Sequence, residues 1–147
     1  MLLLWQRLIL YKFNFQLYMK IYDCFMYFDE EMLLDLRLNI MDKYVDKFVI
    51  TEASYMHSGK TKKLLFDINK FSKFRDKIIY IAIDSTPPDL LKISDNESLE
   101  EKQSKMAINA KKREMYQINK TQDVIKNANS EDIIIISDLD EIPNLEK

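Results

Sequence analysis

Two aspartates separated by one residue, Asp138 and Asp140, follow a run of four isoleucines near the C-terminal end of the sequence. β-Branched apolar residues in such a run predict a strand buried on both faces of a parallel sheet. Alternate side chains of an extended chain share one side, so both carboxylates can project together while Leu139 points away. Ligands of open α/β sheets bind at the carboxyl ends of the strands. The pair therefore predicts a site for Mg²⁺ or Mn²⁺, ions that commonly carry substrate phosphates.

The same acidic residues have other interpretations. Carboxylates that follow a strand often form a solvated turn or cap the next helix, and we expect Glu141 to have such a supporting role. Phosphatases with an Asp-x-Asp nucleophile motif usually carry it at the start of the chain, followed by Thr or Gly, whereas Glu141 and Ile142 follow it here. A phosphoacceptor receiver domain is disfavoured because little chain follows the acidic strand.

Composition excludes several kinds of site. The 147 residues suffice for one domain with a real core, and the formal net charge of −2 argues against a nucleic acid as partner. The single cysteine, Cys24, can form no internal disulfide and predicts a reducing compartment. The single glycine, Gly59, excludes the Gly-rich phosphate loops of nucleotide-binding proteins. A phosphate would therefore need another partner, and a metal ion is the obvious one.

Residues 1–18 are predicted to be an N-terminal extension of a domain that spans residues 19–147. The extension is apolar and aromatic, but Arg7 and Lys12 interrupt it, so no uncharged run reaches the ~20 residues of a membrane-spanning helix. It has no small-residue cleavage site of the signal-peptide type. A segment in peripheral contact with a membrane and a start site assigned too far upstream, with Met19 as the true start, both fit this pattern.

Apolar strand-like segments alternate with helical segments along the sequence. Strands are predicted at residues 20–28, 46–53, 78–83 and 132–137. Helices are predicted after Glu30, at residues 66–75 and at residues 97–129. This order predicts an α/β fold with a mostly parallel sheet and right-handed helical crossovers. The last helix is expected to face the core through the following residues: Ile108, Met115, Ile118, Ile125 and Ala128.

The sequence stops at Lys147, shortly after the acidic strand. A site at the end of that strand needs walls from further segments, so we expect the domain to be truncated after the Asp-x-Asp strand. An edge strand left unpaired in this way would favour self-association.

Five blocks of the sequence, in the same order, resemble glycosyltransferase family 17. The blocks are Met19 to Glu30 with Arg37-Leu38, Val45 to Glu52, His57 to Lys60, Arg113-Glu114-x-x-Gln117-x-Asn119, and Ile136 to Pro143. Together they cover about residues 19–143. Two residues differ from the usual pattern of the family, because Ile118 stands in place of an Arg and Met56 in place of a Thr.

The resemblance implies a GT-A-like fold and a glycosyltransferase. The family includes enzymes of protein N-linked glycosylation that add a bisecting β1,4-linked N-acetylglucosamine to the core mannose of N-glycans. This implies inverting transfer from UDP-N-acetylglucosamine to a glycan acceptor, with Mn²⁺ or Mg²⁺ at Asp138 and Asp140. Contacts to the donor are expected from the following residues: Asp23, Glu52, His57, Arg113, Gln117, Asn119 and Asp138.

Several of these residues have structural alternatives. Asp23 and Glu52 could be paired carboxylates at strand ends, and we expect Arg37 to form an ion pair with Asp23 or Glu30. The three polar residues of the last helix could brace the acidic strand. Inverting transfer also needs a general base for the acceptor hydroxyl. We assign that role to no residue of this chain and expect it in a missing segment.

The alternative to an active enzyme is an inactive or split-gene fragment that at most binds a nucleotide sugar without transfer. For a bacterial or viral protein, the expected location is the cytoplasm, with peripheral membrane contact an option. The animal members of the family are Golgi membrane proteins.

Overall fold

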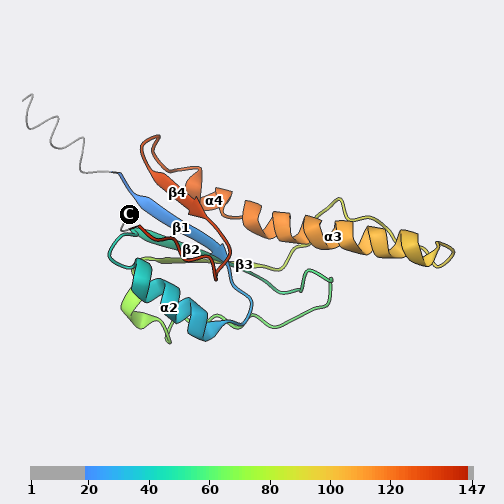
Figure 1. The fold of residues 1–147 in the computed structure, drawn as a ribbon, viewed down its shortest axis with the longest axis horizontal. Coiled ribbons are helices and arrows are strands. Elements are labelled where there is room, and N and C mark those ends of the chain that lie inside the picture. The colour runs from blue at the N-terminus through green and yellow to red at the C-terminus, as the bar shows by residue number, and fades with distance from the viewer. Residues whose placement is uncertain (1–18, 146–147) are drawn as a thin grey trace, which may run out of the picture.

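The computed structural model describes residues 19–145 (Figure 1). The strands of this part are β1 (Ile21–Met26), β2 (Lys47–Ala53), β3 (Ile78–Ile83) and β4 (Ile133–Ile136). The helices are α2 (Glu31–Met41), the 3₁₀ helix η1 (Ser72–Phe74), α3 (Leu99–Asn119) and α4 (Gln122–Ile125). No helix in the described part of the chain is long and apolar enough to cross a membrane. The predicted extension, residues 1–18, lies outside the described residues.

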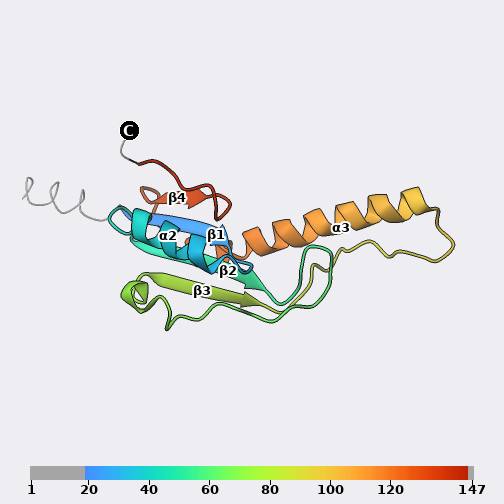
Figure 2. The same cartoon turned by 60° about the horizontal axis from the view of Figure 1, so that its bottom comes forward.

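The strands form one parallel sheet in the order β3-β2-β1-β4 (Figures 1 and 2). β1 lies inside the sheet, with Phe25 opposite Ile50 of β2 and Cys24 opposite Ile136 of β4. Aromatic and β-branched side chains dominate these strands, as is typical of parallel sheets that are covered on both faces. The predicted α/β fold with a parallel sheet is confirmed, and the arrangement is GT-A-like.

The helices cover opposite faces of the sheet (Figure 1). Leu34 and Leu38 of α2 pack in one cluster with Phe25 of β1, whereas Val124 of α4 packs against the cluster that contains Cys24 of β1. Neighbouring residues of a strand point to opposite faces, so α2 and α4 lie on different sides. The chain therefore changes face between β1 and β4, and ligand crevices of open α/β sheets form at such a point.

β4 is the edge strand of the described sheet. The prediction that its four isoleucines are buried on both faces is wrong, since Ile133 and Ile136 are 44% and 51% exposed. The β-branched run determines the type of element, but burial depends on the neighbours. Among the described residues β4 pairs with β1 alone.

The edge of β4 that is unpaired within residues 19–145 predicts self-association of the chain. The strand consists of four uncharged isoleucines, without the Lys or Pro by which natural edge strands avoid pairing with other chains. We expect the purified chain to form dimers or larger species, and Ile133→Lys to shift it toward the monomer. Multi-angle light scattering at several concentrations measures both effects, and a monomeric wild type would contradict the prediction.

The predicted helix of residues 97–129 is divided into α3 and α4. Between them Thr121 donates its hydroxyl to the Ile118 carbonyl at 2.8 Å, a local bond of the kind that competes with helical pairing. The predicted core face is wrong for Ile108 and Met115, which are 44% and 42% exposed. α3 extends well beyond the sheet, so much of its length has no strand to pack against (Figures 1 and 2).

Polar contacts hold the outer part of α3 instead. Its first turn has a capping box, in which Ser98 and Glu101 each accept a hydrogen bond from the backbone N–H of the other. Farther along, the buried amide of Asn109 accepts from the N–H of Leu91 at 2.7 Å and donates to its carbonyl at 2.9 Å. These bonds tie the helix to the loop that precedes it.

The helix predicted at residues 66–75 is a series of turns with η1 at its end. The Phe66 ring stacks on Phe71 and Tyr80, with centroid distances of 5.7 and 4.6 Å. Phe74 meets Phe48 edge to face at 6.3 Å. Aromatic packing against the sheet thus determines the path of this segment and overrides its helical spacing.

Candidate functional site

Two adjacent cavities border the C-terminal ends of β1 and β4. The larger has a volume of about 540 Å³ and lies among the segments that follow β1, β2 and β4; we call it the large cleft. The other has a volume of about 170 Å³ and lies between β1, β4 and the end of α3; we call it the small cavity. Met26 and Asp138 line both. The cavities therefore occupy the place where the chain changes face.

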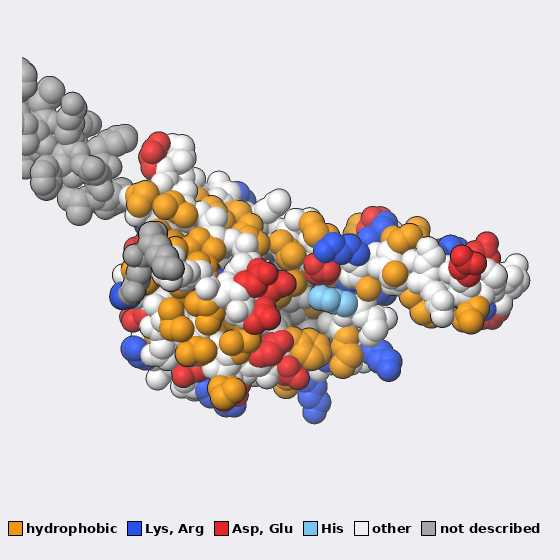
Figure 3. All heavy atoms as spheres, viewed as in Figure 1, with side chains coloured by type: hydrophobic (Ala, Val, Ile, Leu, Met, Phe, Trp, Pro, Cys, Tyr) orange, Lys and Arg blue, Asp and Glu red, His pale blue; other side chains and the backbone are white. Residues whose placement is uncertain are grey.

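Four of the residues predicted from the sequence meet at the large cleft: His57, Gln117, Asp138 and Asp140. Acidic side chains gather beside the single histidine on this face (Figure 3). The other predicted residues do not line the cleft: Asp23, Glu52, Arg113 and Asn119.

The two aspartates lie in residues 137–141, which follow β4 and which we call the acid loop. Asp138 and Asp140 are exposed, whereas Leu139 is 6% exposed and packs in the core cluster that includes α2. The two carboxylates thus leave the strand end on the side away from the core, with the alternation expected from the sequence. Both line the large cleft.

A buried arginine of α2 holds the acid loop in place. The Arg37 guanidinium donates hydrogen bonds to three carbonyl oxygens of the loop, those of Asp138 at 2.6 Å, Leu139 at 3.2 Å and Glu141 at 3.2 Å. It also donates to the hydroxyl of Ser137 at 2.7 Å. Its planar fork of five N–H donors lets one side chain make all these bonds. The backbone that presents the two aspartates is therefore fixed from inside the protein.

Asp23 of β1 is the counter-ion of Arg37. Its carboxylate oxygens accept from Nη2 at 2.7 Å and from Nε at 3.0 Å, and both side chains are 0% exposed. The guanidinium also lies 4.6 Å from the centroid of the Phe25 ring. A buried charge is tolerated when it is paired and hydrogen-bonded, as these two are. The ion pair expected for Arg37 is present, and this geometry favours the structural role of Asp23 over contact with a donor.

Glu52 of β2 is also a buried anchor, with 0% exposure. Its carboxylate accepts hydrogen bonds from the Lys62 ammonium at 2.5 Å, the Leu65 and Phe66 N–H groups at 2.8 and 3.1 Å, and the Tyr80 hydroxyl at 2.8 Å. These bonds tie the segment after the His57 loop to the sheet and again favour the structural role. They also place Lys62 at the wall of the large cleft, where no spacing in the sequence indicated it.

The loop that carries His57 is held by α3. Arg113 donates to the carbonyl of His57 at 3.0 Å, while the histidine side chain itself is exposed. Gly59 has a φ of +91°, and a Cβ added there would lie 2.7 Å from the Arg113 guanidinium. The positive φ favours glycine, because residues with a Cβ are strained in this conformation. Arg113 therefore positions the loop beside the cleft, and this bond goes to the His57 loop and not to the acidic strand that it was expected to brace.

Gly59→Ala is expected to lower the free energy of unfolding by about 1–2 kcal/mol, because alanine is strained at this positive φ. Urea denaturation measures the change. Ser58→Ala is the matched control, since it alters the same loop at a residue with ordinary backbone geometry. Equal stability of the two variants would contradict this description of the loop.

Gln117 and Asn119, at the end of α3, have different surroundings. Gln117 is 4% exposed and donates from Nε2 to the carbonyl of Thr51 at 3.0 Å, which joins α3 to β2. It also borders the large cleft, so it can both brace the sheet and contact a ligand. Asn119 is exposed and borders neither cavity.

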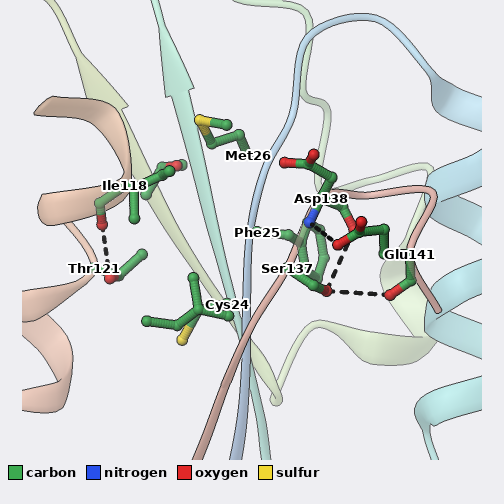
Figure 4. A pocket seen from close by; sticks show the side chains of 10 residues that line it. Cys24, Phe25, Met26, Ile118, Thr121, Ser137, Asp138 and Glu141 are labelled. Carbon is green, nitrogen blue, oxygen red and sulfur yellow. Dashed lines mark hydrogen bonds between the residues drawn. The ribbon is translucent and has the colours of Figure 1, made fainter. Parts of the chain in front are cut away.

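The small cavity was not predicted from the sequence. Ile118 and Thr121 lie on one side of Cys24 and Met26, with Asp138 on the other side (Figure 4). These residues come from β1, from the end of α3 and the turn after it, and from the acid loop, and no single sequence pattern joins them. The fold alone brings them together.

The donor groups at the cleft fit a divalent cation that arrives with a ligand. Among residues 19–145, no group of three or more His, Cys, Asp or Glu side chains could hold a metal ion alone. Mg²⁺ commonly binds through one or two carboxylates, with substrate phosphates and water as the remaining ligands. Asp138 and Asp140 match that requirement.

The sequence model of glycosyltransferase family 17 matches residues 9–147. The matched range begins inside the predicted extension and includes the sheet, the acid loop and both cavities. No curated protein and no solved structure matches the chain. The match covers nearly the whole sequence and confirms the resemblance seen in its five blocks. The chain therefore belongs to glycosyltransferase family 17.

Proposed function

We propose that this glycosyltransferase transfers N-acetylglucosamine from UDP-N-acetylglucosamine to a glycan acceptor, with inversion and a β1,4 linkage. The observation that carries the proposal is the acid loop: Arg37 fixes its backbone, and Asp138 and Asp140 both reach the large cleft. A cleft of about 540 Å³ has the size of a small-molecule site. Donor sugar and linkage come from the family resemblance.

We further propose that Asp138 and Asp140 hold Mn²⁺ or Mg²⁺ together with the donor diphosphate. When bound, the cation supplies positive charge to the diphosphate leaving group as negative charge develops on it. The contribution of the chain is to hold the two carboxylates in advance, since Arg37 determines the path of the loop that carries them. We also propose that His57 and Gln117, which line the same cleft, contact the donor or the acceptor.

Thermal unfolding with UDP-N-acetylglucosamine, with and without Mn²⁺, tests this proposal. A ligand at 100 times its Kd stabilises the folded state by about 2.7 kcal/mol, which raises the unfolding midpoint. We expect a Mn²⁺-dependent rise in the wild type and none in Asp140→Ala. Asp35→Ala, an exposed acid of α2 that lines neither cavity, is the matched control and should behave like the wild type.

A cooperatively unfolding wild type without any ligand-dependent shift would contradict the proposed donor site. A shift without release of UDP in the presence of glycan acceptors would instead support the alternative, a chain that binds the nucleotide sugar without transfer. Release of UDP that depends on an acceptor, and that Asp140→Ala lacks, is the result expected for the enzyme.

A further inference from the structure

We propose that the small cavity holds the pyrimidine base of the donor and that the Thr51 hydroxyl is the group that recognises it. The inference rests on the proposed function, because it assigns a part of the same donor to a second cavity. It gives a ligand class to a space that lies beside the cleft of the two aspartates.

Three residues of the acid loop, Ser137, Asp138 and Glu141, form part of the lining of the small cavity (Figure 4). Its most buried lining residues are Cys24 of β1 and Thr51 of β2, and its walls include Ile118 of α3 and Ile136 of β4. Asp138 belongs to the lining of both cavities. A nucleotide whose base enters the small cavity would therefore bring its diphosphate to the acid loop and its sugar to the large cleft.

Thr51 supplies the polar atom for recognition. Its side chain is 0% exposed, and its Oγ1 has no hydrogen-bond partner within the described residues. Most buried polar side-chain atoms have such a partner, so an unpaired hydroxyl in the lining of a cavity indicates that a ligand completes it. The other threonine of the lining, Thr121, already donates to the carbonyl of Ile118.

The lining favours a neutral ring over a charged group. Its charged residues are Asp138 and Glu141, which would repel an anion, and burial raises the pKa of the Cys24 thiol to about 12, so that it stays neutral. The Thr51 hydroxyl can donate to a ring carbonyl or accept from a ring N–H, and apolar side chains can contact the ring faces. Uracil carries a ring carbonyl and a ring N–H side by side on one edge. A volume of about 170 Å³ also suits the single ring of uracil better than the two rings of a purine.

Thr51→Val tests the hydroxyl, because it removes one polar atom at nearly constant shape. Isothermal titration calorimetry with Mn²⁺ measures the affinity of the variant and the wild type for UDP and for inorganic pyrophosphate. We expect the affinity for UDP to fall about tenfold, while pyrophosphate, which has no base, binds unchanged. The ligand-free variant is expected to unfold about 2–4 °C higher, since an unsatisfied buried hydroxyl is removed.

Ile118→Trp tests the cavity independently of the hydroxyl. A large ring at this wall should reduce binding of UDP at least as strongly as Thr51→Val, with pyrophosphate again unchanged. Met115→Trp is the matched control, since Met115 lies about one turn earlier on α3, is exposed and lines neither cavity. Met56→Trp narrows the large cleft and should weaken UDP-N-acetylglucosamine but not UDP.

Two results would overturn the proposal, and they are distinguishable. If Thr51→Val and Ile118→Trp bind UDP at wild-type strength while Met56→Trp loses it, the base lies in the large cleft and the proposed function stands. If the wild type binds neither UDP nor pyrophosphate with Mn²⁺, this proposal and the proposed function both fail.

Discussion

Replacing Arg37 with Met is expected to lower the free energy of unfolding by about 3–5 kcal/mol, because the Asp23 carboxylate is then buried without its counter-ion. The acid loop also loses its bonds to the guanidinium, so Mn²⁺-dependent stabilisation by UDP-N-acetylglucosamine should disappear. Urea denaturation measures the first effect. Titration of the folded variant with Mn²⁺ and the nucleotide sugar measures the second.

A double variant separates these two effects of Arg37. Asp23→Leu combined with Arg37→Met removes both charges, and apolar replacement of a buried ion pair is often close to neutral. We therefore expect much of the stability to return, while donor binding stays lost because the acid loop still has no internal anchor. Arg37→Lys keeps the charge without the planar fork and should restore binding only in part. Full donor binding by the double variant would show that Arg37 does not position the loop.

Glu52→Ala is expected to have a second large effect, a loss of about 3–5 kcal/mol in the free energy of unfolding. The change leaves the Lys62 side chain, which is only 8% exposed, without its ion pair. It also leaves the N–H groups of Leu65 and Phe66 without acceptors. Urea denaturation measures the total, and hydrogen exchange of residues 62–66 should rise more than that of β1.

Glu52→Gln is the control that distinguishes an anchor from a donor contact. It keeps the shape and one carbonyl oxygen, so it should destabilise less than Glu52→Ala and leave UDP binding intact. A Glu52→Gln variant that remains stable but loses UDP binding would support the donor contact expected from the resemblance. Unchanged stability of Glu52→Ala would contradict the anchor.

The strands were predictable because local composition determines them. The apolar run Ile78–Ile83 forms β3 with the predicted bounds, and the period of two in the acid loop correctly separated Leu139 from the aspartates. The long helix was less predictable. Its apolar residues follow a helical period, but whether they are buried depends on how far the sheet extends beneath α3. The local sequence pattern does not contain that information.

The candidate site likewise has a part that could be predicted from the sequence and a part that could not. Asp138 and Asp140 could be predicted because both lie on one short segment. An ion pair of Arg37 with Asp23 or Glu30 could also be predicted, because a charged residue in an apolar helix needs a partner. The three hydrogen bonds from Arg37 to backbone carbonyls of the acid loop could not be predicted, because every residue type has a backbone carbonyl. The unpaired hydroxyl of Thr51 depends on what surrounds it in three dimensions.

The bonds between Arg37 and the acid loop join residues 100 to 104 positions apart. During synthesis, β1, α2, β2 and β3 can emerge and pack while Arg37 has only Asp23 as a partner. Contacts between distant residues form late because a long loop must close first. We therefore expect the two aspartates to reach their places only after β4 has joined β1. We therefore expect the acid loop to be among the last parts of the described chain to become ordered, and a nascent chain that stalls before residue 138 would carry the arginine without the loop that it holds.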